Sequence, residues 1–310
     1  MKIAVLGAGA MGSLYGMYLS RKHDVTMLDA YQPQVDAINA NGITMLDHDG
    51  GETNVRVQAV PSGADIGPQD LVVVFVKSTQ TYDAMQANQR LIGPNTLVMT
   101  LQNGAGNNRD IANFIAPDRI IVGTSSHNSV GQGLGRFYHS GNGPTNIGPN
   151  VPGPEADAAV EKVAEALRSC GLEVNVIENI QRILWSKLFV NCGLNGLTCL
   201  LNCHLQEMLD NDALWELCRR IVYECVMVAE ADGTYFDRRE ALEVVRQVAE
   251  KDATGLASMV QDRRNRRLTE IDKINGTVVK LAEQYHLDAP YNRMLVGMVH
   301  AVEKNYPRAE

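Results

Sequence analysis

A lysine and two asparagines recur at regular intervals in an otherwise apolar stretch of the sequence. Lys187, Asn191 and Asn195 are spaced by four residues, so on a helix they form one stripe that drifts by only about 40° per step. Most of their neighbours between 184 and 197 are apolar, which predicts a helix buried on nearly all sides. Burial of an unpaired ammonium group is costly. We therefore interpret the stripe as a substrate site with Lys187 as proton donor. The alternative is a lysine that extends to solvent beside amides that bond neighbouring helices.

A glycine-rich loop near the N-terminus is typical of dinucleotide-binding sites. It follows the apolar run 2–6 and precedes a helical pattern at 11–20. In the pattern G-x-G-x-x-G, the first glycine permits a tight turn, the second lets a pyrophosphate approach the backbone, and the third lets the helix pack closely on the strand. The phosphates then meet the positive end of the helix. The members of this loop are Gly7, Ala8, Gly9, Ala10, Met11 and Gly12.

An acidic residue follows the second predicted strand, 24–28. Asp29 stands where a dinucleotide-binding site places the carboxylate that accepts the adenosine ribose hydroxyls. Such a carboxylate repels the 2′-phosphate of NADPH, and no arginine or lysine stands at 30–34 to offset it. The residues themselves therefore predict NADH as the preferred cofactor. A solvent-exposed acid at the end of a strand is the alternative.

Polar side chains also follow two of the most β-prone runs. Lys77 follows the run 71–76, and Gln80 lies one helical turn later. Asn103 comes just after the run 96–101. Because the carboxyl ends of parallel strands line the ligand crevice in such folds, we expect these side chains to contact the ribose of the cofactor or the substrate. Loop solvation or capping is the alternative for each.

Strand and helix patterns alternate in the first half of the chain and predict the elements that position these residues. After about Asn179 only helical periodicity continues, interrupted near Gly233 and at 288–290. This predicts an α/β fold, with a Rossmann-like dinucleotide-binding domain at 1–178 and an all-helical substrate-binding and catalytic domain at 179–310. The expected strands include 2–6, 24–28, 71–76, 96–101, 120–123 and 172–177; the expected helices of the first domain are 11–20, 32–41, 79–91 and 155–169; a hairpin is expected at 42–60 with its turn at 48–51.

Composition excludes several classes of function. The formal charge of −8 does not favour nucleic acid or an anionic membrane as a partner. No apolar run approaches the roughly 20 residues of a membrane-spanning helix, and the apolar stretch at the N-terminus is too short for a signal peptide. The six cysteines show no C-x-x-C spacing, so we expect no metal site and buried thiols in a reducing cytoplasm.

Seven motifs extend these signals over essentially the whole chain. They are GAGAMG at 7–12, VKSTQ at 76–80, LQNG at 101–104, GTSSH at 123–127, HSGNGPTNIGP at 139–149, WSKLFVNCGLNGL at 185–197 and SMVQDRRNRRLTEIDKING at 258–276. Together they resemble the ketopantoate reductase (2-dehydropantoate 2-reductase) family. The resemblance implies a dinucleotide-binding domain, a helical C-terminal domain, and reduction of 2-dehydropantoate to (R)-pantoate with NAD(P)H, a step of pantothenate biosynthesis.

The resemblance also implies a role for each matching residue. The catalytic lysine of the family falls on Lys187, and Glu270 would position the substrate or pair with that lysine. Hydride would pass from the nicotinamide to the C2 carbonyl, with Lys187 stabilising and protonating the alkoxide. On a straight helix Ser258 and Glu270 would lie about 120° apart, so their pairing rests on the resemblance alone. The substrate-binding residues implied are Asn103, Asn191, Asn195 and Ser258, and those near the nicotinamide ribose are Lys77 and Gln80.

The chain departs from the family after the second strand. Members that use NADPH typically offer a basic residue there, whereas this chain offers Asp29, Ala30 and Tyr31. The usual cofactor of the family is thus NADPH, whereas Asp29 in this chain favours NADH. The alternative function is an NADH-dependent D-2-hydroxyacid dehydrogenase, a 2-keto acid reductase similar to D-mandelate dehydrogenase. A dinucleotide-binding regulator without turnover is a second alternative, against which Lys187 and Glu270 argue. The expected partner is a small 2-keto acid, and the sequence is compatible with a homodimer.

Overall fold

The most apolar run of the chain forms the centre of a parallel sheet. The computed structural model describes residues 1–103 and 106–306, and in it β6 (Leu71–Val74) is buried over its whole length. It pairs in parallel with β1 (Lys2–Leu6) on one side and with β7 (Leu97–Thr100) on the other. A strand covered on both faces can be apolar at every position, which explains the continuous run of valines.

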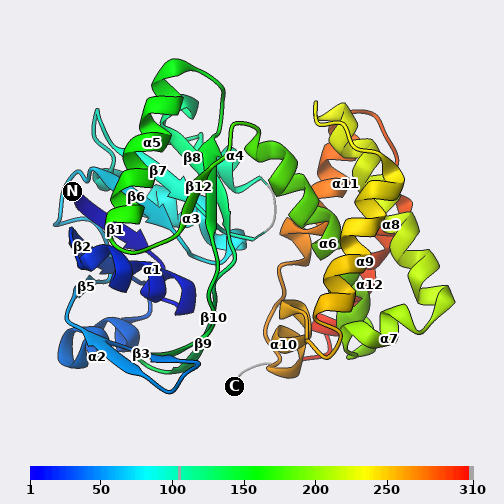
Figure 1. Ribbon diagram of the computed structural model, residues 1–310, viewed down its shortest axis with the longest axis horizontal. Coiled ribbons are helices and arrows are strands. Elements are labelled where there is room, and N and C mark those ends of the chain that lie inside the picture. The colour runs from blue at the N-terminus through cyan, green and yellow to red at the C-terminus, as the bar shows by residue number, and fades with distance from the viewer. Residues whose placement is uncertain (104–105, 307–310) are drawn as a thin grey trace. The chain divides into compact units, whose positions relative to one another are not determined.

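The first of two compact units is built on this sheet (Figure 1). The unit comprises Met1–Gln102 and Asn107–Ile180. Its eight strands lie in the order β12-β11-β8-β7-β6-β1-β2-β5, and every neighbouring pair is parallel except β8 and β11. The alternation of strands and helices therefore predicted the α/β class of this unit correctly. The strands not yet given are β2 (Asp24–Leu28), β5 (Gln58–Val60), β8 (Ile120–Ser125), β11 (Thr145–Pro149) and β12 (Val174–Val176).

The expected hairpin at 42–60 is correct only in its first part. β3 (Ile43–Asp47) and β4 (Glu52–Val55) pair antiparallel around a turn closed by the Gly50 amide and the Asp47 carbonyl. Residues 58–60 do not continue the hairpin, because they form β5 and pair in parallel with β2. The hairpin joins β10 (Arg136–Gly141) and β9 (Asn128–Gly133) in a separate sheet of order β4-β3-β10-β9.

Five helices complete the first unit. α1 (Ala10–Ser20) and α5 (Pro154–Ser169) pack against each other and against the large sheet, and their buried faces are apolar. The helix expected at 79–91 is divided into α3 (Thr81–Ala87) and two flanking 3₁₀ turns. The break falls at Asn88, whose side chain donates to the Ala84 carbonyl and accepts from the Gly63 amide. The remaining helices are α2 (Gln32–Asn41) and α4 (Asn107–Ile111).

A chain of polar groups crosses the interior of the first unit. His139 on β10 lies beside Asp47 on β3, and its Nδ1 is 3.1 Å from the Asp47 Oδ1. Its Nε2 is 3.1 Å from Nδ1 of His127, which follows β8. The other ring nitrogen of His127 is buried without a hydrogen-bond partner. Burial, followed by the neighbouring His139, lowers the pKa of His127 to about 4.

The second unit comprises residues 103–106 and 181–310, and its described part from Gln181 onward is built of helices. The long helix α6 (Ile180–Leu201) carries the apolar stretch noted in the sequence, and Phe189 and Cys192 on it are almost wholly buried. Gly233, with φ of 88°, follows the end of α8 (Asp212–Ala231), and α12 (Pro290–Glu303) begins just after the second predicted interruption, so the structure breaks the helices at both predicted places. The other helices are α7 (Leu205–Leu209), α8 (Asp212–Ala231), α9 (Arg238–Lys251), α10 (Ser258–Arg264), η4 (Ile271–Lys273), α11 (Asn275–Gln284) and α12 (Pro290–Glu303).

Two buried asparagines connect four of these helices. The Asn275 amide donates to the Cys192 carbonyl at 3.1 Å and to the Asn292 side chain at 2.9 Å. Asn292 in turn donates to Glu224 at 2.8 Å and to the Ile221 carbonyl at 3.2 Å. These bonds join α6, α8, α11 and α12 at fixed positions in an otherwise apolar core, because each buried amide must keep its partners.

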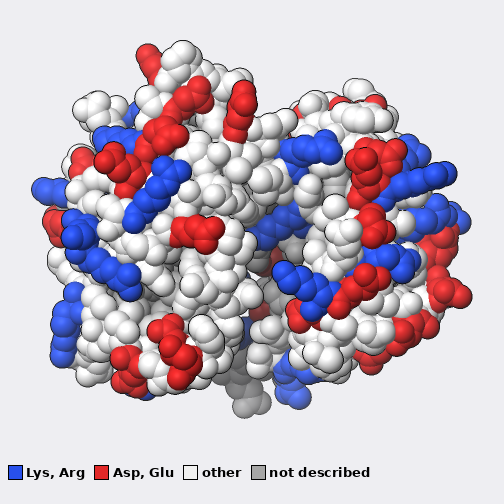
Figure 2. Space-filling model, in the orientation of Figure 1, with Lys and Arg blue, Asp and Glu red and all other residues white. Residues whose placement is uncertain are grey.

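The surface and the cysteines agree with the composition. On the face drawn in Figure 2, acidic and basic side chains are interspersed. Within the described ranges, none of the helices is long and apolar enough to cross a bilayer. All six cysteines are buried and free, as expected from the sequence.

Candidate active site

The glycine loop joins β1 to α1 and has the geometry that a pyrophosphate needs. A Cβ on Gly7 would lie 2.7 Å from the Val76 nitrogen, and one on Gly12 would lie 1.9 Å from the Gly7 oxygen, so neither position accepts a side chain. A Cβ on Gly9 would meet nothing within 4 Å. Gly9 is the N-cap of α1 and offers no side chain to the first turn. Open space therefore adjoins the positive end of a helix, which fits a dinucleotide phosphate.

The carboxylate of Asp29 is fixed beside this loop. One oxygen accepts from the Ala8 amide at 2.9 Å, and the other accepts from the Tyr31 amide at 2.9 Å. Gln34 on α2 donates to the Ala8 carbonyl at 2.7 Å and holds the loop from a second side. Sequence reasoning missed Gln34, because only the folded chain brings α2 to the loop. Tyr31 is 59% exposed at the start of α2, next to the acid.

Lys77 and Asn103 follow the neighbouring parallel strands β6 and β7, as predicted. Both are exposed, as is Gln80. Gln102 bridges the two strand ends: its amide donates to the Val76 carbonyl at 2.6 Å and to the Thr81 hydroxyl at 2.9 Å. Sequence reasoning missed Gln102, although it stands inside the LQNG motif. It fixes the backbone that precedes both candidate residues.

In the second unit, Lys187 lies on α6 among buried apolar side chains. Trp185, Leu188 and Phe189 beside it are each less than 5% exposed, and Lys187 itself is half-buried. Burial lowers the pKa of Lys187 to about 8, and the charge of Glu270 opposes that shift. A lysine in this state is largely protonated at neutral pH and releases its proton readily.

The rest of the predicted stripe lies on the same face of α6. Asn195 is almost fully buried, and its amide donates to the Asn191 side chain at 3.4 Å. The structure places Glu270 at the N-terminus of η4 and within electrostatic range of Lys187. Ser258 is the first residue of α10 and is exposed. Among the described residues, no three histidine, cysteine, aspartate or glutamate side chains gather into a metal-binding group.

Family models match both units. One described as ketopantoate reductase PanE/ApbA matches residues 3–152, and its C-terminal counterpart matches residues 179–303. The 2-dehydropantoate 2-reductase of Halobacterium salinarum is 33% identical over 312 aligned residues, covering 98% of this chain and 100% of that protein. That of Streptococcus pyogenes serotype M1 is 31% identical and covers 98% of each chain.

Solved structures of similar proteins share the fold over nearly the whole chain. A complex of D-mandelate dehydrogenase with NADH and anilino(oxo)acetate has a TM-score of 0.91 at 30% identity and covers 99% of both chains. A PanE/ApbA family ketopantoate reductase from Ralstonia eutropha JMP134 has a TM-score of 0.89 at 28% identity and also covers 99% of both chains.

Proposed function

The chain belongs to the ketopantoate reductase family, and on that basis we propose that it reduces 2-dehydropantoate to (R)-pantoate with a nicotinamide dinucleotide, for pantothenate biosynthesis. The observation that carries the proposal is Lys187, a lysine with a lowered pKa on an apolar helix beside two amides and within range of Glu270. A helix that served only to fill the core would not carry a partly buried lysine beside two amides, because burial of the ammonium group is costly. The six buried free thiols further support a reducing, cytoplasmic location.

The first unit supplies the cofactor site in this proposal. Gly7, Gly9 and Gly12 leave the space and the helix terminus that suit the pyrophosphate, and Asp29 would accept the adenosine ribose hydroxyls. Lys77, Gln80 and Asn103 would contact the nicotinamide ribose or the substrate. The bound nicotinamide supplies a hydride for the C2 carbonyl of the substrate.

The second unit supplies the proton. Lys187 would donate to the alkoxide that develops at the C2 oxygen, and its positive charge would stabilise that oxygen beforehand. Glu270 would keep Lys187 charged, because its carboxylate raises the pKa of the lysine against the effect of burial. Asn191, Asn195 and Ser258 would hold the carboxylate and hydroxyl groups of the substrate.

We propose NADH as the preferred cofactor. Asp29 is held beside the glycine loop by two backbone amides, so its charge cannot easily turn away from an incoming 2′-phosphate. The solved complex of D-mandelate dehydrogenase contains NADH. That similarity also supports the second candidate, an NADH-dependent D-2-hydroxyacid dehydrogenase that acts on branched or aromatic 2-keto acids.

A kinetic comparison tests both candidates. The rate of NADH or NADPH oxidation is measured with 2-dehydropantoate, 2-ketoisovalerate and phenylglyoxylate. The highest kcat/KM for 2-dehydropantoate supports the proposed function. The highest value for either of the other acids selects the D-2-hydroxyacid dehydrogenase. Binding of a dinucleotide without oxidation by any of the three acids would instead indicate a regulator.

A further inference from the structure

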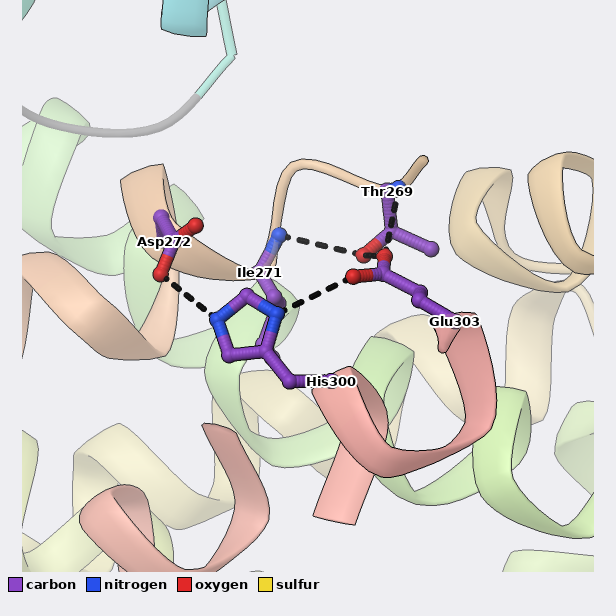
Figure 3. A network of polar contacts seen from close by, with 5 residues as sticks. All are labelled: Thr269, Ile271, Asp272, His300 and Glu303. Atoms are coloured by element: carbon purple, nitrogen blue, oxygen red, sulfur yellow. Dashed lines mark hydrogen bonds and ion pairs between the residues drawn. The ribbon is translucent and has the colours of Figure 1, made fainter. Parts of the chain in front are cut away.

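The short segment that carries Glu270 is held from both sides by one hydrogen-bonded network (Figure 3). On the N-terminal side, the amide and the hydroxyl of Thr269 both donate to the Glu303 Oε1 at 2.7 Å. The Thr269 hydroxyl also accepts from the Ile271 amide at 3.3 Å. On the C-terminal side, the Asp272 Oδ1 lies 3.0 Å from the Nε2 of His300.

His300 closes the network from α12. Its Nδ1 lies 3.0 Å from the Glu303 Oε2, so each ring nitrogen faces a carboxylate oxygen. A carboxylate can only accept, so both contacts are hydrogen bonds only when both nitrogens carry protons. Burial opposes that charge, but the hydrogen bonds with Asp272 and Glu303 together with the charges of these two carboxylates outweigh burial, and the pKa of His300 is raised.

We propose that His300 is a positioning residue for Glu270, and that its imidazolium form fixes the segment 269–272 by binding Glu303 and Asp272 together. The inference rests on the proposed function, in which Glu270 keeps Lys187 protonated. Glu270 lies between Thr269 and Asp272, the two residues through which the network holds this segment. When His300 loses one proton, one of its two hydrogen bonds to the carboxylates is lost, and the Glu270 carboxylate can then move relative to Lys187.

The contact with Asp272 is the one that depends on His300 most. Glu303 is only 7% exposed and has Thr269 as a second donor. After burial, its charge helps to raise the pKa of Cys199 on α6 and of Tyr306, and the charges of Arg263 and Asp262 on α10 act on the same two groups. The Asp272 side chain is half exposed and meets His300 from the opposite side. A neutral His300 is therefore expected to keep its proton toward Glu303 and to release Asp272.

A purely structural role for His300 predicts a different result. If His300 only fastened η4 to α12, its replacement would lower the stability and leave the protonation of Lys187 unchanged. If it positions Glu270, its replacement weakens the interaction between Glu270 and Lys187. The pKa of Lys187 then falls, because that interaction is what raises it.

The test follows the titration of Lys187 by carbon NMR of isotope-labelled lysine, with the resonance assigned by its absence in Lys187→Met. The wild type is compared with His300→Gln and with Asp272→Asn, which removes a charge from a half-exposed site and should leave the fold intact. His48→Gln, at an exposed turn, is the matched control. We expect the pKa of Lys187 to fall by about 0.5 or more in both variants and to stay unchanged in the control.

The kinetic readout is the pH profile of keto acid reduction. In both variants the alkaline limb of kcat/KM should move to lower pH together with the Lys187 titration, and a fall of about 0.5 in that pKa lowers kcat/KM about twofold near pH 8. An unchanged Lys187 titration in folded His300→Gln and Asp272→Asn overturns the inference. If the wild type reduces no 2-keto acid, the proposed function fails, whereas the NMR titration still reports whether His300 acts on the pair.

Discussion

The Asp29 carboxylate accepts a hydrogen bond from the Ala8 amide, 2.9 Å away inside the glycine loop. The residue that would select the cofactor is thus hydrogen-bonded to the loop that would bind its pyrophosphate. A variant must remove the charge without releasing the loop, and Asp29→Asn keeps an oxygen that can accept from Ala8.

We expect the wild type to prefer NADH over NADPH by about tenfold or more in kcat/KM, since each 1.4 kcal/mol of charge repulsion is about tenfold in affinity. Asp29→Asn should narrow this gap, mainly by improving the use of NADPH. Asp36→Asn removes the same charge from an exposed position on α2 and should leave the ratio unchanged. Steady-state kinetics with both cofactors measure the ratio of kcat/KM for NADH to that for NADPH in each variant. Equal use of the two by the wild type would show that Asp29 does not face the ribose.

Lys187→Met should separate activity from stability. Loss of the proposed proton donor is expected to lower kcat by about 100-fold, with binding of the cofactor unchanged. The melting temperature near pH 7 should rise by about 2 °C or more, because the folded protein holds the pKa of Lys187 at about 8, below its ordinary value of 10.5, and so disfavours the charged form. Lys280→Met, on the exposed face of α11, is the control and should change neither quantity.

The pH dependence follows from the same lysine. In the proposed mechanism Lys187 must be charged to donate its proton, so kcat/KM for reduction should fall as pH rises through about 8, while oxidation of the hydroxy acid should increase over the same range. Glu270→Gln removes the charge that raises the pKa of Lys187 and should move this limb to lower pH. Glu283→Gln, an exposed acid paired with Arg293 on the surface, should leave the profile in place. A fully active Glu270→Gln with an unshifted limb would remove Glu270 from the mechanism.

His127 should make the protein sensitive to mild acid. Its pKa is about 4 in the folded protein, below the ordinary 6.5, so between these values the unfolded chain binds a proton that the folded chain does not. Stability is therefore lost as pH falls from 6.5 to 4, by up to about 3 kcal/mol. His127→Asn, which keeps a donor for His139, should flatten this dependence in urea unfolding, and His48→Asn should not. An identical slope in wild type and His127→Asn would contradict the assignment.

Local patterns predicted the parts of the fold that are locally determined. The glycine loop, the valine-rich β6 and the turn at Gly50 each depend on neighbours in sequence, and each was recovered. The strand β9 was not, because Asn128–Gly133 is exposed at almost every residue and owes its conformation to pairing with β10. The end of the predicted hairpin failed for a similar reason, since Ala59 is buried against β2 in the other sheet.

The candidate site shows the same division. The spacing of Lys187, Asn191 and Asn195 was sufficient to predict that they share one helix face, because the single helix α6 carries all three. Spacing could not predict where Ser258 and Glu270 lie relative to each other, because no single helix carries both. The helix α10 ends at Arg264, and Arg266 has a left-handed conformation with φ of 54°. The amides of Arg266 and Arg267 close that turn on the carbonyls of Arg263 and Asp262. Gln34, Gln102 and His300 act across the fold, and their positions follow only from tertiary structure.

The buried thiols can report partial unfolding of the protein, because they are distributed unequally between the two units. Cys170 lies in the first unit and the other five cysteines lie in the second. Burial raises the pKa of Cys199 to about 11 and that of Cys218 to about 12, so little reactive thiolate forms at neutral pH while the helices stay packed. An alkylating reagent should therefore label each cysteine only when its surroundings open. The masses of the labelled species would then separate opening of the sheet unit, which adds one label, from opening of the helical unit, which adds up to five.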